Sequence, residues 1–349
     1  MVTEILIVDP VEPDRTAIAR AAACLRRGGL VAFPTETVYG LGAHALDRTA
    51  VARLFEVKGR PPNDPLIVHV AALEEAAALV TRVPDAARDL AARFWPGPLT
   101  LVFPRAEAVP TDVTAGLDTV AIRVPAHPVA HALLVAARLP IAAPSANLFS
   151  RPSPTRAIHV VDDLGGRIDM VLDAGPTSVG VESTVLDLTQ DPPVVLRPGA
   201  VTVEALRGVV PSVRVRPPGA AASGAMASPG LLDRHYAPRT PMTLYDGRSA
   251  STRAALVEAI AEAVAAGRRV GLLATSEHAL PVRHLPVVIA DLGSERDPGQ
   301  VASRLYAALR ELDAAQLDLI VAQGPETDEG LWRAVHDRLR RAATRVVGS

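Results

Sequence analysis

The stretch Leu30-Val-Ala-Phe33-Pro-Thr-Glu-Thr-Val-Tyr-Gly-Leu-Gly42 gives the first indication of the fold. Its four apolar residues predict a buried strand over 30–33, which Pro34 is expected to end. Polar residues 35–37 follow the end of this strand. The glycines after them predict a loop in which the backbone can approach a ligand closely.

Helical patterns flank this strand on both sides. Asp14 is expected to cap a helix that ends at Gly28-Gly29, and Asp47 to cap a second helix. Further helices are predicted over 85–94 and 128–138, and further strands over 66–70, 99–103, 119–124, 170–173, 184–188 and 194–197. Because strands outnumber helices, residues 1–210 are expected to form a mixed α/β domain with some antiparallel strands.

The composition changes after residue 210. Residues 217–230 are rich in Pro, Gly, Ala and Ser and have no periodicity, which predicts an interdomain linker over 211–241. The end of this linker carries Arg234-His-Tyr236, which a simple spacer does not need. We therefore expect the linker to contribute to the functional site.

Residues 242–349 return to a regular alternation of strands and helices. Strands are predicted over 242–245, 270–274, 286–290 and 317–321, and helices over 250–266, 299–313 and 329–344. This alternation predicts a smaller Rossmann-like domain with a parallel sheet. A length of 349 residues also favours two domains over one.

The composition excludes several classes of function. A net charge of -2 provides no general basic field for nucleic acid, and a single cysteine excludes a disulfide framework and a Cys-based zinc cluster. A P-loop motif is absent, and the spacing of His127 and His131 lacks a third metal ligand. Without a signal peptide or a long apolar segment, we expect a cytoplasmic protein that does not associate with membranes.

The use of basic and amide residues is strongly biased. Lys58 is the single lysine among 36 basic residues, and the only asparagines are Asn63 and Asn147. A lysine that persists in an arginine-rich chain is a candidate for chemistry that needs a compact ammonium group.

Polar groups gather at several predicted strand ends. Lys58 and Arg60 are separated by one glycine and could clamp a polyphosphate. Arg123 interrupts an apolar strand, where a buried charge needs a partner or a ligand, and it shares one strand face with Thr119. A Ser-x-Asn pair, Ser145/Asn147, ends another predicted strand.

Five motifs together resemble those of the YrdC-type threonylcarbamoyl-AMP synthases. They are Pro34-Thr-Glu-Thr-Val-Tyr-Gly-Leu-Gly, Lys58-Gly-Arg, Phe94-Trp-Pro-Gly-Pro-Leu-Thr, Ala121-Ile-Arg-Val-Pro and Pro144-Ser-Ala-Asn. The resemblance covers about residues 1–210. The segment Ser228-Pro-Gly…Arg234-His-Tyr-Ala-Pro238 and the appended α/β domain resemble the long, two-domain form of that family.

This resemblance implies a twisted mixed-sheet domain with a deep basic cavity that holds ATP beside threonine. It implies synthesis of L-threonylcarbamoyladenylate and diphosphate from L-threonine, bicarbonate or CO₂, and ATP, with Mg²⁺ carried by the ATP and no tightly bound protein-ligated metal. The product would supply the activated group for a tRNA adenosine next to the anticodon, through a separate tRNA threonylcarbamoyl-transferase machinery. Direct RNA binding by this chain is expected to be weak or absent.

The resemblance also assigns site residues position by position. Lys58 and Arg60 are the expected catalytic residues. Threonine contacts are expected from Thr37, His69, Arg123, Ala143 and Ser183. ATP contacts are expected from Lys58, Arg60, Asp64, Thr119, Ser145, Asn147, Ser153, Arg197 and Tyr236.

Asp64 departs from the family pattern, which commonly has asparagine there. A carboxylate only accepts hydrogen bonds, so it would repel phosphates unless it faced the ribose, the base or Mg²⁺. Tyr236 is expected to help the linker close over the nucleotide as a lid.

Two alternatives belong to other classes. An RNA-binding protein would need a basic surface with aromatic side chains, but aromatic residues make up only 3% of the chain. A carbamoyltransferase of the hydrogenase-maturation type would carry zinc-binding cysteine clusters, which one cysteine cannot provide.

Overall fold

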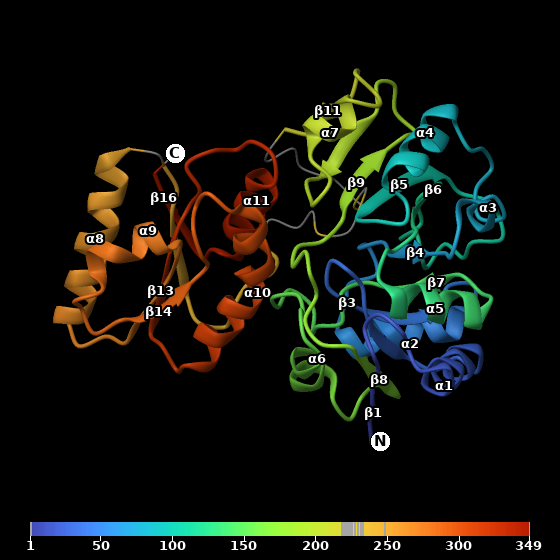
Figure 1. The fold of residues 1–349 in the computed structure, drawn as a ribbon, viewed down its shortest axis with the longest axis horizontal. Helices are drawn as coiled ribbons and strands as arrows, with labels where there is room; N and C mark the ends of the chain where they lie inside the picture. Colours follow the sequence, from blue (N-terminus) through green and yellow to red (C-terminus); the bar gives the residue numbers. More distant parts are fainter. Residues whose placement is uncertain are drawn as a thin grey trace. The chain divides into compact units, whose positions relative to one another are not determined.

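The computed structural model describes residues 2–217, 226, 228, 230, 234–247 and 249–348. The chain divides into two compact units (Figure 1). The first contains residues 1–149, 153–178 and 182–231, and the second contains residues 150–152, 179–181 and 232–349. Each unit has a β-sheet of its own.

The first unit is built on a large mixed sheet in the order β1-β8-β2-β3-β7-β4-β6-β5-β9-β10-β11. Its strands are β1 (Glu4–Ile7), β2 (Val31–Pro34), β3 (Tyr39–His44), β4 (Ile67–His69), β5 (Leu99–Pro104), β6 (Thr119–Arg123), β7 (Ile141–Ala142), β8 (Met170–Asp173), β9 (Thr184–Asp187), β10 (Val194–Arg197) and β11 (Arg214–Val215). Pairs such as β5/β6 are antiparallel and pairs such as β4/β6 are parallel, which confirms the predicted mixed sheet.

The first two helices of this unit begin where the sequence predicts. The helices are α1 (Arg15–Arg26), α2 (Arg48–Lys58), α3 (Leu73–Ala76), α4 (Asp85–Phe94), α5 (Pro128–Ala137), α6 (Ala157–Leu164) and α7 (Val203–Arg207). The carboxylates of Asp14 and Asp47 accept hydrogen bonds from backbone N–H groups of the first turns of α1 and α2, so both predicted caps are confirmed.

The predicted loop around Gly40 and Gly42 is wrong, because both glycines lie in β3. This strand pairs antiparallel with β2 and places Gly40 opposite Phe33. A Cβ atom added to Gly42 would lie 2.8 Å from Phe33 Cε1 and 2.9 Å from Ile141 Cγ2. Gly42 is therefore required by the close packing of an aromatic ring and Ile141 on the strand, not by a turn.

Two large apolar clusters attach helices to this sheet, and a third cluster is different. The first two include Leu54 of α2 and Leu25 of α1, respectively. The third cluster draws its members from strands β4, β5, β6, β9 and β10 only: Ile67, Val102, Ala121, Val185 and Leu196, with Val194 packed against them. No helix residue of the described chain belongs to this third cluster. Because no helix packs against the cluster, a ligand could bind on this region of the sheet.

The second unit has a five-stranded sheet in the order β14-β13-β15-β12-β16. Its elements are β12 (Met242–Tyr245), α8 (Ala250–Ala265), β13 (Val270–Ala274), α9 (Ser276–Ala279), β14 (Val288–Asp291), α10 (Pro298–Ala314), β15 (Leu319–Gln323), α11 (Trp332–Ala342) and β16 (Arg345–Val347). Each described pair of neighbouring strands is parallel, as predicted. No helix in the described part of the chain is long and apolar enough to cross a membrane.

We predict that Gly42→Ala destabilises the first unit by about 1–3 kcal/mol, because the added methyl group must displace the Phe33 ring or the Ile141 side chain. The midpoint of urea unfolding, followed by the fluorescence of Trp95 in a Trp332→Phe background, measures this change. Gly208→Ala is the matched control, since Gly208 is exposed and has helical backbone angles. Equal midpoints for the Gly42 and Gly208 variants would contradict the packing argument.

Candidate active site

Strand register places several of the expected site residues in one row across the first sheet. His69 lies opposite Arg123 in the parallel β4/β6 pair. The register of the β5/β6 pair places Thr100 opposite Arg123. In the β5/β9 pair Thr100 lies opposite Val185, and in the β9/β10 pair Val185 lies opposite Arg197. Because paired residues point to the same face of a sheet, this row projects two arginines, a histidine and a threonine to one side.

The Arg123 side chain is 5% exposed and is held by three hydrogen bonds. Nη2 donates to Glu36 Oε1 at 2.6 Å, Nη1 donates to Thr37 Oγ1 at 3.0 Å, and Nε donates to the Gly97 carbonyl at 3.1 Å. The partner that a buried charge needs is therefore Glu36. These bonds involve three of the five N–H donors of the guanidinium.

His69 is buried beside this guanidinium. Burial, together with the charge of Arg123, lowers the pKa of His69 to about 3, so its ring is neutral at physiological pH. Its Nδ1 atom has no hydrogen-bond partner among the described residues. A neutral, buried ring nitrogen next to a cation can accept or donate one hydrogen bond to a ligand.

Ser183 and Arg197 join the same row. Ser183 Oγ lies 2.8 Å from Thr100 Oγ1, and Arg197 Nη2 donates to the Ser183 carbonyl at 3.0 Å and to its hydroxyl at 3.2 Å. Next to Ser183 in the chain, Glu182 accepts a hydrogen bond from Ser153 Oγ at 2.5 Å. Glu182 thus links Ser153 to the segment that carries Ser183, and Ser183 contacts Arg197.

Lys58 and the Ser-x-Asn pair also meet. Lys58 Nζ donates to the carbonyl oxygens of Ser145 at 2.6 Å and Asn147 at 2.5 Å, and the lysine is 1% exposed. Burial, and then the charge of Arg60, hold the pKa of Lys58 well below its usual range. Lys58 is the last residue of α2, and Gly59 ends the helix with φ of 61°.

Arg60 and Asp64 form a buried ion pair. Arg60 Nη2 lies 2.8 Å from Asp64 Oδ2, and Nε donates to the Asp64 carbonyl at 3.0 Å. Burial raises the pKa of the Asp64 carboxyl, while Arg60, Lys58 and Arg197 act in the opposite direction. The charge of Asp64 is therefore offset by three nearby cations, which removes much of its repulsion toward a phosphate.

Three expected site residues have a different relation to this cluster. The Ala143 N–H donates to the Ile67 carbonyl at 3.0 Å, so Ala143 continues the sheet next to His69. Thr119 is partly exposed and lies at the opposite end of β6 from Arg123. Tyr236 belongs to the second unit, where Arg338 lies over its ring at 5.1 Å, and its contact with a nucleotide stays a prediction.

Sequence reasoning did not assign Glu36, Thr100 or Glu182 to the site. Glu36 is 87 positions from its partner Arg123, so no local pattern reveals the pair. Thr100 is a polar residue in an apolar strand, and the antiparallel pairing of that strand with β6 could have identified it. The position of Glu182 next to Ser183 in the chain was the one signal that could have assigned it to the site.

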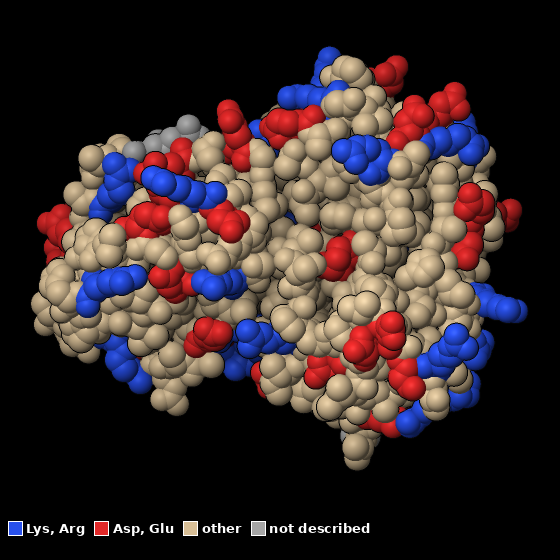
Figure 2. Space-filling view, viewed as in Figure 1, with Lys and Arg blue, Asp and Glu red and all other residues tan. Residues whose placement is uncertain are grey.

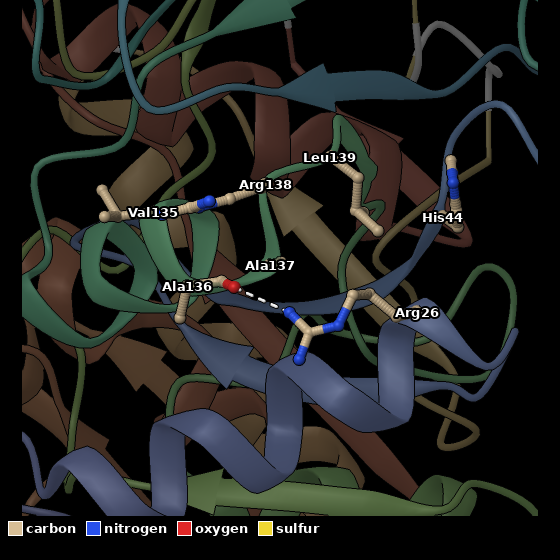
Figure 3. A pocket seen from close by; sticks show the side chains of 7 residues that line it. All are labelled: Arg26, His44, Val135, Ala136, Ala137, Arg138 and Leu139. Atoms are coloured by element: carbon tan, nitrogen blue, oxygen red, sulfur yellow. Dashed lines mark hydrogen bonds between the residues drawn. The ribbon is translucent and has the colours of Figure 1, made fainter.

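A separate surface hollow of the first unit contains none of the expected site residues (Figure 3). It is lined by Arg26, His44 and residues 135–139, and Arg26 Nη1 donates to the Ala136 carbonyl at 2.7 Å. None of its lining residues is a carboxylate or a hydroxyl, and none belongs to the row of Arg123 and His69 or to the cluster around Lys58.

In the first unit, buried cations lie beside hydroxyl groups, an arrangement that suits an anionic ligand. Residues 23–199 match the family described as "Telomere recombination", and residues 201–344 match the family described as "Threonylcarbamoyl-AMP synthase, C-terminal domain". The chain belongs to the threonylcarbamoyl-AMP synthase family.

Relatives of known name and structure agree with this assignment. The threonylcarbamoyl-AMP synthase of Pyrococcus abyssi is 46% identical over 93% of each chain. That of Bacillus subtilis is 44% identical over 97% of this chain and 96% of its own. The crystal structure of P. abyssi Sua5 complexed with L-threonine superposes with a TM-score of 0.91 at 43% identity, covering 99% of this chain and 100% of that one.

We predict that the ring of His69 does not titrate between pH 5 and 8, because burial and the charge of Arg123 disfavour its protonated form. The unfolded chain takes up a proton at His69 below its ordinary pKa of 6.5, so this residue makes the protein less stable as the pH falls from 6.5 toward 3. The loss is about 2 kcal/mol at pH 5.

Histidine NMR shifts measured against pH test the titration directly. The free energy of unfolding of the parent and His69→Gln proteins, measured at pH 7 and pH 5, tests the effect on stability. Between these two pH values the free energy of unfolding should fall more in the parent than in the variant. A His69 resonance with a midpoint near pH 6.5 would contradict the buried, neutral ring.

Proposed function

We propose that this chain joins L-threonine, bicarbonate or CO₂, and ATP into L-threonylcarbamoyladenylate and releases diphosphate. One observation carries this proposal: a cluster of buried cations, Lys58, Arg60 and Arg197, is continuous with the row that contains Arg123 and His69. The cluster of three cations suits phosphates, and the row that contains Arg123 and His69 suits an amino acid. The names of the relatives and the threonine complex of P. abyssi Sua5 support the same reaction.

Arg123 is proposed to bind the threonine carboxylate. A guanidinium can present two parallel N–H groups to a carboxylate, and Glu36 and Thr37 already fix its orientation. Thr37, Ala143 and Ser183 would position the rest of the amino acid. Because His69 is neutral, it adds no positive charge against the threonine amine, which must lose its proton before it attacks carbon.

Two bond-forming steps follow from this arrangement. The neutral amine nitrogen adds to the carbon of CO₂ and releases a proton, or adds to the carbon of bicarbonate and releases water, and either route gives a carbamate. A carbamate oxygen then bonds to the α-phosphorus of ATP while the bond from that phosphorus to the bridging oxygen of diphosphate breaks. Neither step needs a covalent enzyme intermediate, so positioning and charge stabilisation supply most of the acceleration.

Lys58, Arg60 and Arg197 are proposed to stabilise the charge on the phosphates, with Ser145, Asn147, Ser153 and Thr119 as further nucleotide contacts. Lys58 is held between two carbonyl oxygens and has a lowered pKa, so an arriving polyphosphate would favour its charged form. Asp64 is best assigned to orienting Arg60, and Mg²⁺ would arrive with ATP as part of the substrate.

The product is proposed to pass to a separate transferase that modifies tRNA in the cytoplasm. Tyr236 is proposed to help close the site. A strong direct interaction with RNA has little support. On the face seen in Figure 2, basic and acidic side chains are interspersed over both units and do not gather into one basic patch. Salt-sensitive RNA binding that ignores threonine would favour the RNA-binding alternative.

We predict that Lys58→Met lowers the rate of adenylate synthesis by about 10²–10³-fold, as expected when one preorganised charged donor is lost. Lys58→Arg should be similarly impaired, because a guanidinium is too large for the space between the Ser145 and Asn147 carbonyls. Diphosphate release, measured with a coupled assay, gives both rates. Exposed Arg88→Ala is the control, and normal rates in both lysine variants would remove Lys58 from the mechanism.

Arg123→Lys should weaken threonine binding by about tenfold or more while the KM for ATP changes little, since a lysine cannot form the paired N–H contacts. Calorimetric titration with threonine measures the affinity, and circular dichroism verifies the fold. An unchanged threonine affinity would show that the carboxylate binds elsewhere.

The proposed function is tested by incubating the protein with ATP, threonine, Mg²⁺ and ¹³C-bicarbonate and analysing the products by mass spectrometry. We expect a threonylcarbamoyl-adenylate that is one mass unit heavier than the product from unlabelled bicarbonate. If AMP forms without any carbon-labelled adduct, the reaction is a different one.

A further inference from the structure

A cavity of about 220 Å³ lies in the second unit, at the carboxyl ends of β13 and β15. The two strands are neighbours. From β13 the chain continues to β14 on one side, and from β15 it continues to β16 on the opposite side. The connections therefore diverge between the two strands, and such a switch point is where open parallel α/β sheets bind ligands.

Three potential metal ligands line this cavity: His278, Glu295 and Glu326. His278 Nε2 lies 3.8 Å from Glu295 Oε2 and 3.5 Å from Glu326 Oε1. A charge-assisted hydrogen bond would be shorter, about 2.7–2.9 Å. Two ligands of one tetrahedral zinc ion, each bound at about 2.0–2.2 Å, are about 3.3–3.6 Å apart, which is close to the observed separations.

The orientation of His278 is set by a neighbour. Its Nδ1 atom lies 3.0 Å from the hydroxyl oxygen of Thr275, which is 8% exposed. When Nδ1 donates its hydrogen to this hydroxyl, the lone pair of Nε2 points toward the two carboxylates. Three electron-rich atoms then converge, an arrangement that a cation between them stabilises, and metal-binding histidines usually donate their second N–H to an oxygen in this way.

A fourth residue indicates that the site has an exchangeable position. Gln323 ends β15, lines the same cavity and is 8% exposed, and its amide nitrogen has no hydrogen-bond partner among the described residues. Such a buried donor is suited to an oxygen atom of water or of a small ligand bound to the metal. Arg253 donates to Glu326 Oε1 at 2.8 Å and helps to orient that carboxylate.

We propose that the second unit binds one zinc ion through His278, Glu295 and Glu326, with a remaining coordination position open to the cavity. One imidazole and two carboxylates form a ligand set that zinc accepts, and three protein ligands with an open position distinguish such a site from a closed structural one. The resemblance implies no tightly bound protein-ligated metal, and no local pattern indicates this site, because its ligands are separated by 17 and 31 positions and follow different strands. It lies outside the residues assigned to the synthase reaction.

Zinc binding by the full-length chain tests the proposal. The metal content is measured after desalting, and the affinity by competition with a chromophoric chelator, for the parent, His278→Ala and Glu326→Gln. The controls are His284→Ala and Glu311→Gln, two exposed residues of the same unit. Circular dichroism confirms that each variant is folded.

We expect one zinc per chain in the parent and both controls, and an affinity at least about tenfold weaker in both site variants. Cobalt(II) bound to the parent should show the visible absorption of a four-coordinate ion, and this band should be lost in His278→Ala. The absence of stoichiometric zinc in the parent, or equal affinities in the parent and His278→Ala, would overturn the proposal.

Discussion

The buried ion pair between Arg123 and Glu36 is the interaction on which the first unit depends. A guanidinium in the middle of a sheet is tolerated only when its charge is compensated and its N–H groups are satisfied. Glu36, Thr37 and the Gly97 carbonyl meet this requirement, and they come from two segments far from Arg123 in the sequence. Burial, reinforced by the charge of Arg123, keeps His69 neutral, so the ion pair contributes to both the geometry and the electrostatics of the proposed threonine site.

The second group of cations is compensated by a different means. Lys58 is held mainly by backbone carbonyl oxygens, and Arg60 is paired with a carboxylate four residues away. Neutral carbonyl groups accept hydrogen bonds from an ammonium without cancelling its charge, so the charged form of Lys58 is left for an arriving phosphate to stabilise. Asp64 offsets only part of the positive charge near Arg60, which suits a site that must both bind ATP and release diphosphate.

The sequence predicted those elements that short-range patterns determine. The strands over 170–173, 194–197, 242–245 and 270–274 and the helix over 85–94 have the predicted bounds. Strand β3 was missed because glycine weakens a local strand signal, although at Gly42 it is required by the Phe33 ring of the neighbouring strand. The site residues came from resemblance to a family, and partners such as Glu36 and Thr100 depend on long-range pairing that no local pattern contains.

We propose that Arg123 and Lys58 hold an amino acid and a nucleotide side by side in the first unit. A crystal structure of the chain with threonine and a non-hydrolysable ATP analogue tests it most directly. We expect the threonine carboxylate on the Arg123 guanidinium, the phosphates within hydrogen-bonding distance of Lys58, and the amine on the side of the α-phosphate. Either ligand bound away from these two side chains would show that they do not form the substrate site.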